Sequence, residues 1–283
     1  MRKIAVAWRI CAYQLRRLIM SYKSILLLML FVVYALIFAT PVADFAVSYN
    51  QKVNILGLLP VLTSDYLAQM VLMMGIVIMF SDAPFIDHNQ VYIMMRCKRS
   101  VWAAGQILYI MTAMLMFIIA ALVISILTLV PHVSIDGLWG KVWQTLAHQG
   151  GDLQITVSAR MVNQYTVIEA LGYSTFLAWL AGYLIGSLMF LLNFITNTKV
   201  GLVAGGLLCL MNMAIYNSLF SYSLYSLSPL SLANLSVVDR YGMTYGYPTL
   251  VYAGIAMIFV TIVITLMILN LAKRGHRCLE MNV

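Results

Sequence analysis

Charge-free apolar runs recur along the chain, and they constrain its fold more than any other feature. A helix needs about 20 apolar residues to cross the hydrocarbon core of a bilayer. The sequence is 63% hydrophobic and 9% charged, whereas soluble domains are about a quarter charged. We therefore expect an all-α integral membrane protein, a single domain over 1–283 with six transmembrane helices. The expected spans lie at about 24–46, 64–82, 101–130, 169–196, 200–221 and 248–271.

The second of these spans is the weakest. Only Tyr66–Ser81 is free of charge, and this run of 16 residues is short for a transmembrane helix. Asp65 would then lie at the membrane interface. We retain the span, because removing it leaves an odd number of spans and spoils the charge pattern.

The basic residues determine the expected orientation. Cytoplasmic loops of membrane proteins are enriched in Lys and Arg. With both termini in the cytoplasm, 13 of the 17 basic residues fall in cytoplasmic segments, and only Lys52, Lys141, Arg160 and Arg240 lie outside. The net charge of +8 is thus explained by orientation, and no nucleic-acid partner is expected.

Residues 1–23 form an expected amphipathic helix. Its basic face contains Arg2, Arg9 and Arg16, seven residues apart, with Arg17 beside them. At 100° per residue this face lies opposite an apolar side, as in helices that lie in the membrane interface. The alternative is a basic flank that only orients the first span. The expected apolar side comprises Ile4, Trp8, Cys11, Leu15, Leu18 and Tyr22.

Two outer segments are longer than simple connections. Residues 131–168 contain Trp139, Val142, Trp143 and Leu146 at helical spacing, which predicts a short helix anchored in the outer interface by its indoles. Residues 221–247 are rich in Ser and Tyr. This second segment is either a surface loop or a re-entrant piece whose backbone is covered by protein.

Sequence motifs for several activities are absent. The chain has no GxxxxGK[ST] phosphate loop, no HExxH, no GxSxG and no CxxC pair. We therefore expect no metal site, no catalytic residue and no ATP bound by this chain. No ionisable residue lies near the middle of a span, where an ion-coupled carrier usually needs one. The polar residues deep in the spans are Asn193, Asn212 and Asn217, which we expect to bond neighbouring helices.

Two pairs of glycines are spaced for close helix packing. Gly182 and Gly186 form one GxxxG pair, and Gly201 and Gly205 form another. Small residues at this spacing let two helix backbones approach. The partner helix lies either within the same subunit or across a dimer interface.

The turn at 82–100 carries the most specific pattern. It begins with acid and ends with base, and Asp87 can cap a short helix through about Met95. Such a helix can press an apolar face into a groove on a cytosolic partner, with polar residues around the contact. The alternative is a positive-inside anchor. The expected contact residues are Asp87, Gln90, Val91, Met94, Met95, Arg96 and Arg99.

The chain resembles type-2 ABC transporter permeases. The resemblance rests on the layout of an N-terminal amphipathic helix, six spans and a helical turn between the second and third. It also rests on Asp82-Ala-Pro84-Phe85-Ile86, Arg96-Cys-Lys-Arg99-Ser-Val-Trp102, Gln106 and Leu138-Trp139-Gly140-Lys141-Val142, which look like permeases of bacterial exporters. The resemblance implies that 1–23 is an elbow helix and that 82–99 is a coupling helix.

The resemblance also implies the partners and the location. The chain would be the non-catalytic membrane subunit of an ABC exporter in the bacterial cytoplasmic membrane, paired with a second permease, identical or homologous. ATP and Mg²⁺ would bind a separate P-loop ATPase. Two alternatives remain, a secondary carrier or channel that works without an ATPase and a sensor or immunity protein that sequesters a peptide.

Overall fold

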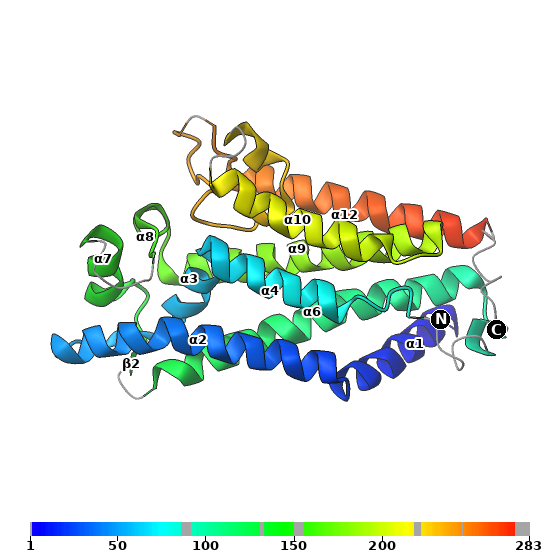
Figure 1. Ribbon diagram of the computed structural model, residues 1–283, viewed down its shortest axis with the longest axis horizontal. Coiled ribbons are helices and arrows are strands. Elements are labelled where there is room, and N and C mark those ends of the chain that lie inside the picture. The colour runs from blue at the N-terminus through cyan, green and yellow to red at the C-terminus, as the bar shows by residue number, and fades with distance from the viewer. Residues whose placement is uncertain are drawn as a thin grey trace.

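A bundle of long helices forms the body of the protein, with connecting segments gathered at its two ends (Figure 1). The computed structural model describes residues 2–85, 92–94, 96–130, 133–149, 156–217, 222–244 and 246–274. Apart from helices, the described residues contain one two-residue parallel pairing, between β1 (Val53–Asn54) and β2 (Val133–Ser134). The expected all-α fold is therefore found in the described residues.

Four helices in the described part of the chain are long and apolar enough to cross a membrane. They are α2 (Tyr22–Ser48), α6 (Arg99–Leu129), α9 (Val167–Thr196) and α12 (Leu250–Lys273). They correspond to the expected first, third, fourth and sixth spans. The expected fifth span corresponds to α10 (Val200–Tyr216), an apolar helix of 17 residues.

The expected second span corresponds to only the second helix of a bent pair. The 3-10 turn η1 (Ile55–Gly57) leads into α3 (Leu58–Ser64), and α4 (Tyr66–Met79) follows after a bend of 81°. The bend falls at Asp65, whose backbone is extended and whose carboxylate accepts hydrogen bonds from the amides of Leu67 and Ala68. A capping carboxylate starts a new helix. The span over 64–82 is therefore a 14-residue helix, and the apolar pattern did not predict α3.

Helix α9 lies at the centre of the bundle. It contacts α3, α4, α6, α10 and α12. In its most apolar stretch, 72% of the residues are buried. A capping box of Thr166 and Glu169 fixes its start. The four glycines of the GxxxG pairs are buried at contacts inside this chain, where a Cβ on Gly186 would lie 2.7 Å from Ile110 Cγ2.

The N-terminal helix α1 (Arg2–Ile19) packs against α6 and has three distinct faces. Its buried face consists of Ala7, Ile10, Cys11 and Gln14. A second face is apolar and exposed, with Ile4, Trp8 and Ile19. Of the expected basic residues, Arg9, Arg16 and Arg17 are exposed, and the side chain of Arg2 lies outside the described part. The contact with α6 therefore buries only part of the expected apolar side. Cys11 is buried, whereas Ile4 and Trp8 of the same expected side are exposed.

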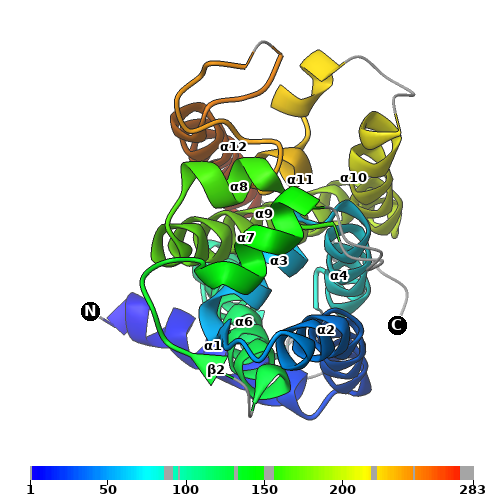
Figure 2. The same ribbon diagram turned by 90° about the vertical axis from the view of Figure 1, so that its left-hand side faces the viewer.

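The end of the bundle opposite α1 is covered by short elements (Figure 2). They are α7 (Gly140–Gln149), α8 (Ala159–Gln164), η2 (Tyr222–Ser226) and α11 (Pro229–Leu232). Trp139, Val142, Trp143 and Leu146 share one buried face, as expected. The expected anchoring by the indoles is wrong, because both rings are buried in the protein. Trp139 Nε1 donates to the Tyr165 carbonyl at 2.7 Å, and Trp143 Nε1 donates to the Asn54 carbonyl at 2.9 Å.

The segment after η2 is packed into the bundle. Leu230, Leu235 and Val238 are buried. Gln69 of α4 holds the segment, because its amide donates to the Leu230 carbonyl and its oxygen accepts from the amides of Asn212 and Asn234. Most residues of 228–239 are therefore covered by protein, whereas Tyr241 and Met243 lie on the surface.

Candidate functional site

Only part of the expected coupling helix is described. Asp87, Gln90, Val91 and Met95 lie outside the described residues. Residues 92–94 and 96 are helical, and Arg99 is the first residue of α6.

Within the described part, the side chains differ in exposure. Arg96 and Arg99 are exposed. Met94 is half-buried against the core, whereas Tyr92 is 66% exposed. Tyr92 is therefore the exposed aromatic side chain of this described stretch.

The turn that leads into this region, residues 81–85, is held from three helices; we call it the anchored turn. From α1, Gln14 Nε2 donates to the Phe85 carbonyl at 3.1 Å. From α9, Asn193 Nδ2 donates to the Ala83 carbonyl at 2.9 Å. From α2, Lys23 Nζ lies 2.7 Å from a carboxylate oxygen of Asp82 and donates to Ser81 Oγ at 2.7 Å.

Phe85 fixes the end of the anchored turn. Its backbone is left-handed, with φ of 60°, a conformation that costs a bulky residue about 1–3 kcal/mol. Its buried ring packs edge-on against Tyr109 of α6, with centroids 5.0 Å apart, and lies 6.4 Å from Phe190 of α9. The ring contacts and the bond from Gln14 offset the backbone cost.

Asn193 joins the anchored turn to the connection between α9 and α10. Its Oδ1 accepts a hydrogen bond from the amide of Gly201 at 2.6 Å. Gly201 is required there, because a Cβ would lie 2.5 Å from the Met189 carbonyl oxygen. The anchored turn, the end of α9 and the start of α10 therefore form one bonded unit.

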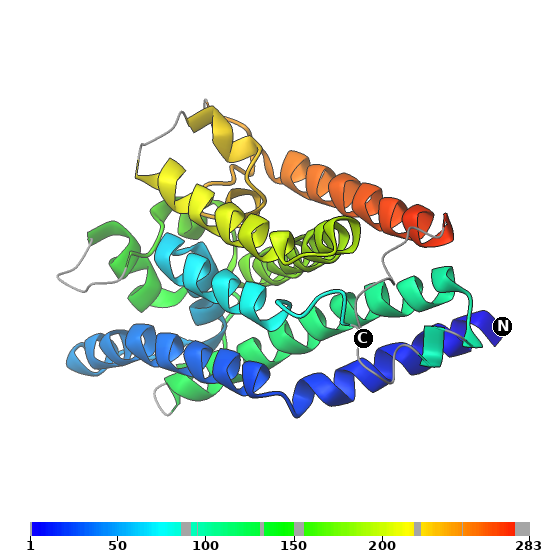
Figure 3. The same cartoon turned by 45° about the vertical axis from the view of Figure 1, so that its right-hand side comes forward.

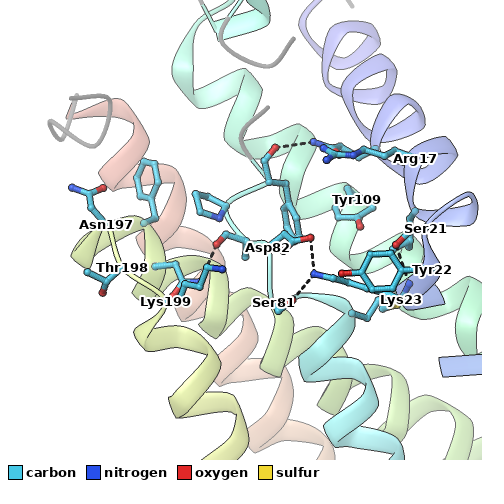
Figure 4. Close-up of a pocket in the computed structure, with 18 residues that line it drawn as sticks. Arg17, Ser21, Tyr22, Lys23, Ser81, Asp82, Tyr109, Asn197, Thr198 and Lys199 are labelled. Atoms are coloured by element: carbon cyan, nitrogen blue, oxygen red, sulfur yellow. Dashed lines mark hydrogen bonds and ion pairs between the residues drawn. The ribbon is translucent and has the colours of Figure 1, made fainter. Parts of the chain in front are cut away.

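A cavity of about 680 Å³ opens beside the anchored turn (Figure 4). Three cationic residues line it, Arg17 from α1, Lys23 from α2 and Lys199 from the α9–α10 connection. Among its described lining residues, Asp82 is the only carboxylate. The side chain of Lys23 is 12% exposed and that of Asp82 is 61% exposed. Since exposed ion pairs contribute about 0–1 kcal/mol, this pair positions Asp82 more than it stabilises the fold.

The described residues near this site offer no set of groups for metal binding. No group of three or more His, Cys, Asp or Glu residues is placed to hold a metal ion within the described ranges. Burial raises the pKa of the Cys97 thiol, so the thiol is protonated at neutral pH. The groups that line the cavity, Arg17, Lys23, Lys199 and Asp82, can bind a ligand by charge and hydrogen bonding.

A second cavity, of about 290 Å³, lies at the opposite end of the bundle. Tyr66 stacks on Tyr216 there with ring centroids 3.8 Å apart, and the guanidinium of Arg160 lies 4.0 Å from the centroid of Tyr247. These residues come from four separate segments. No local pattern in the sequence signals their meeting.

Two residues that contact the anchored turn were not predicted from the sequence. Gln14 and Lys23 were not expected to touch residues 81–85. A signal for Gln14 exists, because helical spacing places this polar residue beside the apolar residues Ala7, Ile10 and Cys11.

Asn193 and Asn212 were expected to bond neighbouring helices, and the bonds of Asn193 with Gly201 of α10 and of Asn212 with Gln69 of α4 confirm this. The same expectation for Asn217 is wrong, because its amide donates to the Met213 carbonyl of its own helix. No family model, no curated protein and no solved structure matches the chain.

Proposed function

We propose that this chain is the membrane subunit of an ATP-driven exporter of the ABC class, coupled to a separate P-loop ATPase. In this proposal α2, the bent α3–α4 pair, α6, α9, α10 and α12 are six spans. Helix α1 is the elbow helix, and both termini are cytoplasmic. A second permease, identical or homologous, completes the assembly in the bacterial cytoplasmic membrane. ATP and Mg²⁺ bind the ATPase.

The distribution of positive charge supports this orientation. Helix α1, the start of α6 and the end of α12 lie at the same end of the bundle (Figure 3). Most of the described basic residues belong to this end, including those of α1, Arg96, Lys98 and Lys273. The opposite end contains Lys52, Lys141, Arg160 and Arg240. Because Lys and Arg accumulate on the cytoplasmic side, the end with α1 is the cytoplasmic end.

The anchored turn is the observation that carries the proposal. A coupling helix must pass the movement of the ATPase to the spans, so the chain next to it must be fastened to them. Gln14 fastens the turn to α1, and Asn193 fastens it to α9. A displacement of residues 86–98 therefore reaches both sides of the bundle.

A secondary carrier finds less support. Proton-coupled carriers place ionisable residues in protected positions on the transport path. Asp82, the carboxylate that the described part of the inner cavity offers, is exposed and paired with Lys23. This arrangement is that of a structural ion pair at a surface.

Site-directed cross-linking in the native membrane tests the proposal. Tyr92→Cys and Arg96→Cys, each in a cysteine-free background, should form cross-links to a cytosolic protein whose peptides contain a P-loop. Lys141→Cys is the matched control at the opposite end and should not form this cross-link. Substrate-driven proton flux through the purified chain alone, without any ATPase, would overturn the proposal in favour of a carrier. Peptide binding from outside, with no ATPase captured, would favour the sensor or immunity role.

A charge substitution distinguishes two roles of residues 92–96, a contact with the ATPase and a simple anchor at the membrane surface. Tyr92→Asp places a charge in the expected contact without removing a packed core side chain, and burying an unpaired charge is costly. It should abolish capture of the ATPase while insertion stays normal. Met94→Asp is less specific, because Met94 packs partly against the core. Normal capture and transport with Tyr92→Asp would show that this part of the turn only anchors the chain.

A further inference from the structure

We propose that the cavity beside the anchored turn binds a phosphate-bearing amphiphile of the inner leaflet, such as an anionic phospholipid. This role is separate from transport and does not require an ATPase. It follows from the charge, the size and the rim of the cavity.

The charge of the lining favours an anion. Arg17 and Lys199 reach the cavity from different elements, with Asp82 between them (Figure 4). Lys23 Nζ lies 2.7 Å from a carboxylate oxygen of Asp82, so this ion pair balances the negative charge of Asp82. Arg17 and Lys199 add further positive charge. Basic pockets between membrane helices on the cytoplasmic side are suited to phosphate headgroups.

The size of the cavity favours an organic headgroup over a bare ion. Its volume of about 680 Å³ is within the usual range of about 300–1,000 Å³ for ligand pockets. Polar groups line part of it, such as Ser21 and Thr198, whereas Phe85 and Tyr109 line another part. A phosphate attached to a glycerol-sized group would use both surfaces.

The rim of the cavity favours a ligand that arrives from the lipid. Leu18 and Ser21 line the cavity. Their neighbours Ile19 and Met20 are 57% and 75% exposed, and Tyr22, also in the lining, is 73% exposed. Apolar side chains at the edge of a charged pocket can lie along acyl chains while the phosphate enters the pocket. A soluble phosphate would gain nothing from this rim.

Native mass spectrometry of the purified full chain in neutral detergent tests the site with phosphatidylglycerol as the probe. Diacylglycerol with the same acyl chains is the phosphate-free comparison. Lys199→Gln should weaken phosphatidylglycerol binding about fivefold, the effect of one charge near an anionic lipid. Lys199→Arg should restore it. Lys273→Gln removes one exposed charge at the same end, outside the described lining, and is the matched control.

The outcomes separate the possible sources of the phosphate. Selective binding of phosphatidylglycerol that Lys199→Gln weakens and Lys273→Gln does not supports the lipid site. Saturable binding of inorganic phosphate that displaces the lipid and shows the same dependence supports the same pocket with a soluble phosphate. Equal weakening by Lys273→Gln, or equal binding of diacylglycerol, would overturn the proposal. A melting temperature that is unchanged in Lys199→Gln establishes that the variant is folded.

Discussion

Asn193 and Ala83, 110 residues apart in the chain, are joined by a hydrogen bond of 2.9 Å from the side-chain amide to the backbone carbonyl. The same side chain accepts a bond from the Gly201 amide at 2.6 Å. One buried amide thus connects the turn after α4 with both helices of the α9–α10 pair. In a transporter, such a connection lets a movement at the cytoplasmic surface reach the centre of the bundle.

Asn193→Ala should lower both stability and coupling. It leaves the Ala83 carbonyl and the Gly201 amide unpaired, and an unsatisfied buried group costs about 1–3 kcal/mol. The melting temperature of the purified chain in detergent should fall by several degrees. In the proposed complex with an ATPase, export should fall more than ATP hydrolysis.

Asn217→Ala is the control for Asn193→Ala. The Asn217 side chain is exposed, and its amide donates to the Met213 carbonyl of α10, one helical turn earlier in the chain. Its loss should change stability by less than about 0.5 kcal/mol. If Asn193→Ala and Asn217→Ala change the melting temperature equally, the hydrogen bond from Asn193 to Ala83 does not stabilise the fold.

Gln69→Leu should destabilise the packing of residues 228–244, the segment after η2, without changing the insertion of the long helices. Gln69 is 2% exposed and is the common partner of Leu230, Asn212 and Asn234. Its loss leaves two amide donors and one carbonyl without this partner. Trypsin added to intact cells should then cleave faster after Arg240. Gln51→Leu, at an exposed glutamine of the same end, should not change the rate.

Thiol labelling should confirm the orientation. In a cysteine-free background, cysteines at Lys52 and at Met243, which is 84% exposed, should react with a membrane-impermeant reagent on intact cells. Cysteines at Lys98 and Lys273 should react only after the membrane is opened. Labelling of Lys273→Cys from outside would mean that the bent α3–α4 pair does not cross the membrane.

Because of Asp239, the stability of the fold should fall at acid pH. Burial by itself raises the pKa of this carboxyl, but hydrogen bonds from Thr244, Tyr241 and Gln164 outweigh it and lower the pKa to about 2. A lowered pKa means that the ionised form stabilises the folded state. The contribution is full above the ordinary Asp pKa of about 4 and is lost as the pH falls from about 4 to 2.

The measurement compares Asp239→Asn with the unmodified chain. Thermal unfolding in detergent should show a clear difference between the two at pH 6, and the difference should shrink as the pH falls below about 4. A difference that stays constant between pH 6 and pH 2 would show that ionised Asp239 does not stabilise the fold.

The sequence by itself determined where most of the long helices lie. Whether a segment enters a membrane depends on the apolar content of about 20 consecutive residues, which is a local property. The boundaries of α2, α6, α9 and α12 therefore follow the charge-free runs closely. The shared face of Trp139, Val142, Trp143 and Leu146 was also readable, because helical spacing alone places them together.

Only the tertiary structure decided which polar groups meet. Gln14 and Phe85, or Gln69 and Asn212, are far apart in sequence, and a polar residue in an apolar run looks the same whether it faces a carbonyl, another amide or a ligand. The buried place of Trp143, whose indole donates to the Asn54 carbonyl, has the same origin. In each case the partner is supplied by another helix or loop, so its identity depends on how the helices pack and not on the local run of residues.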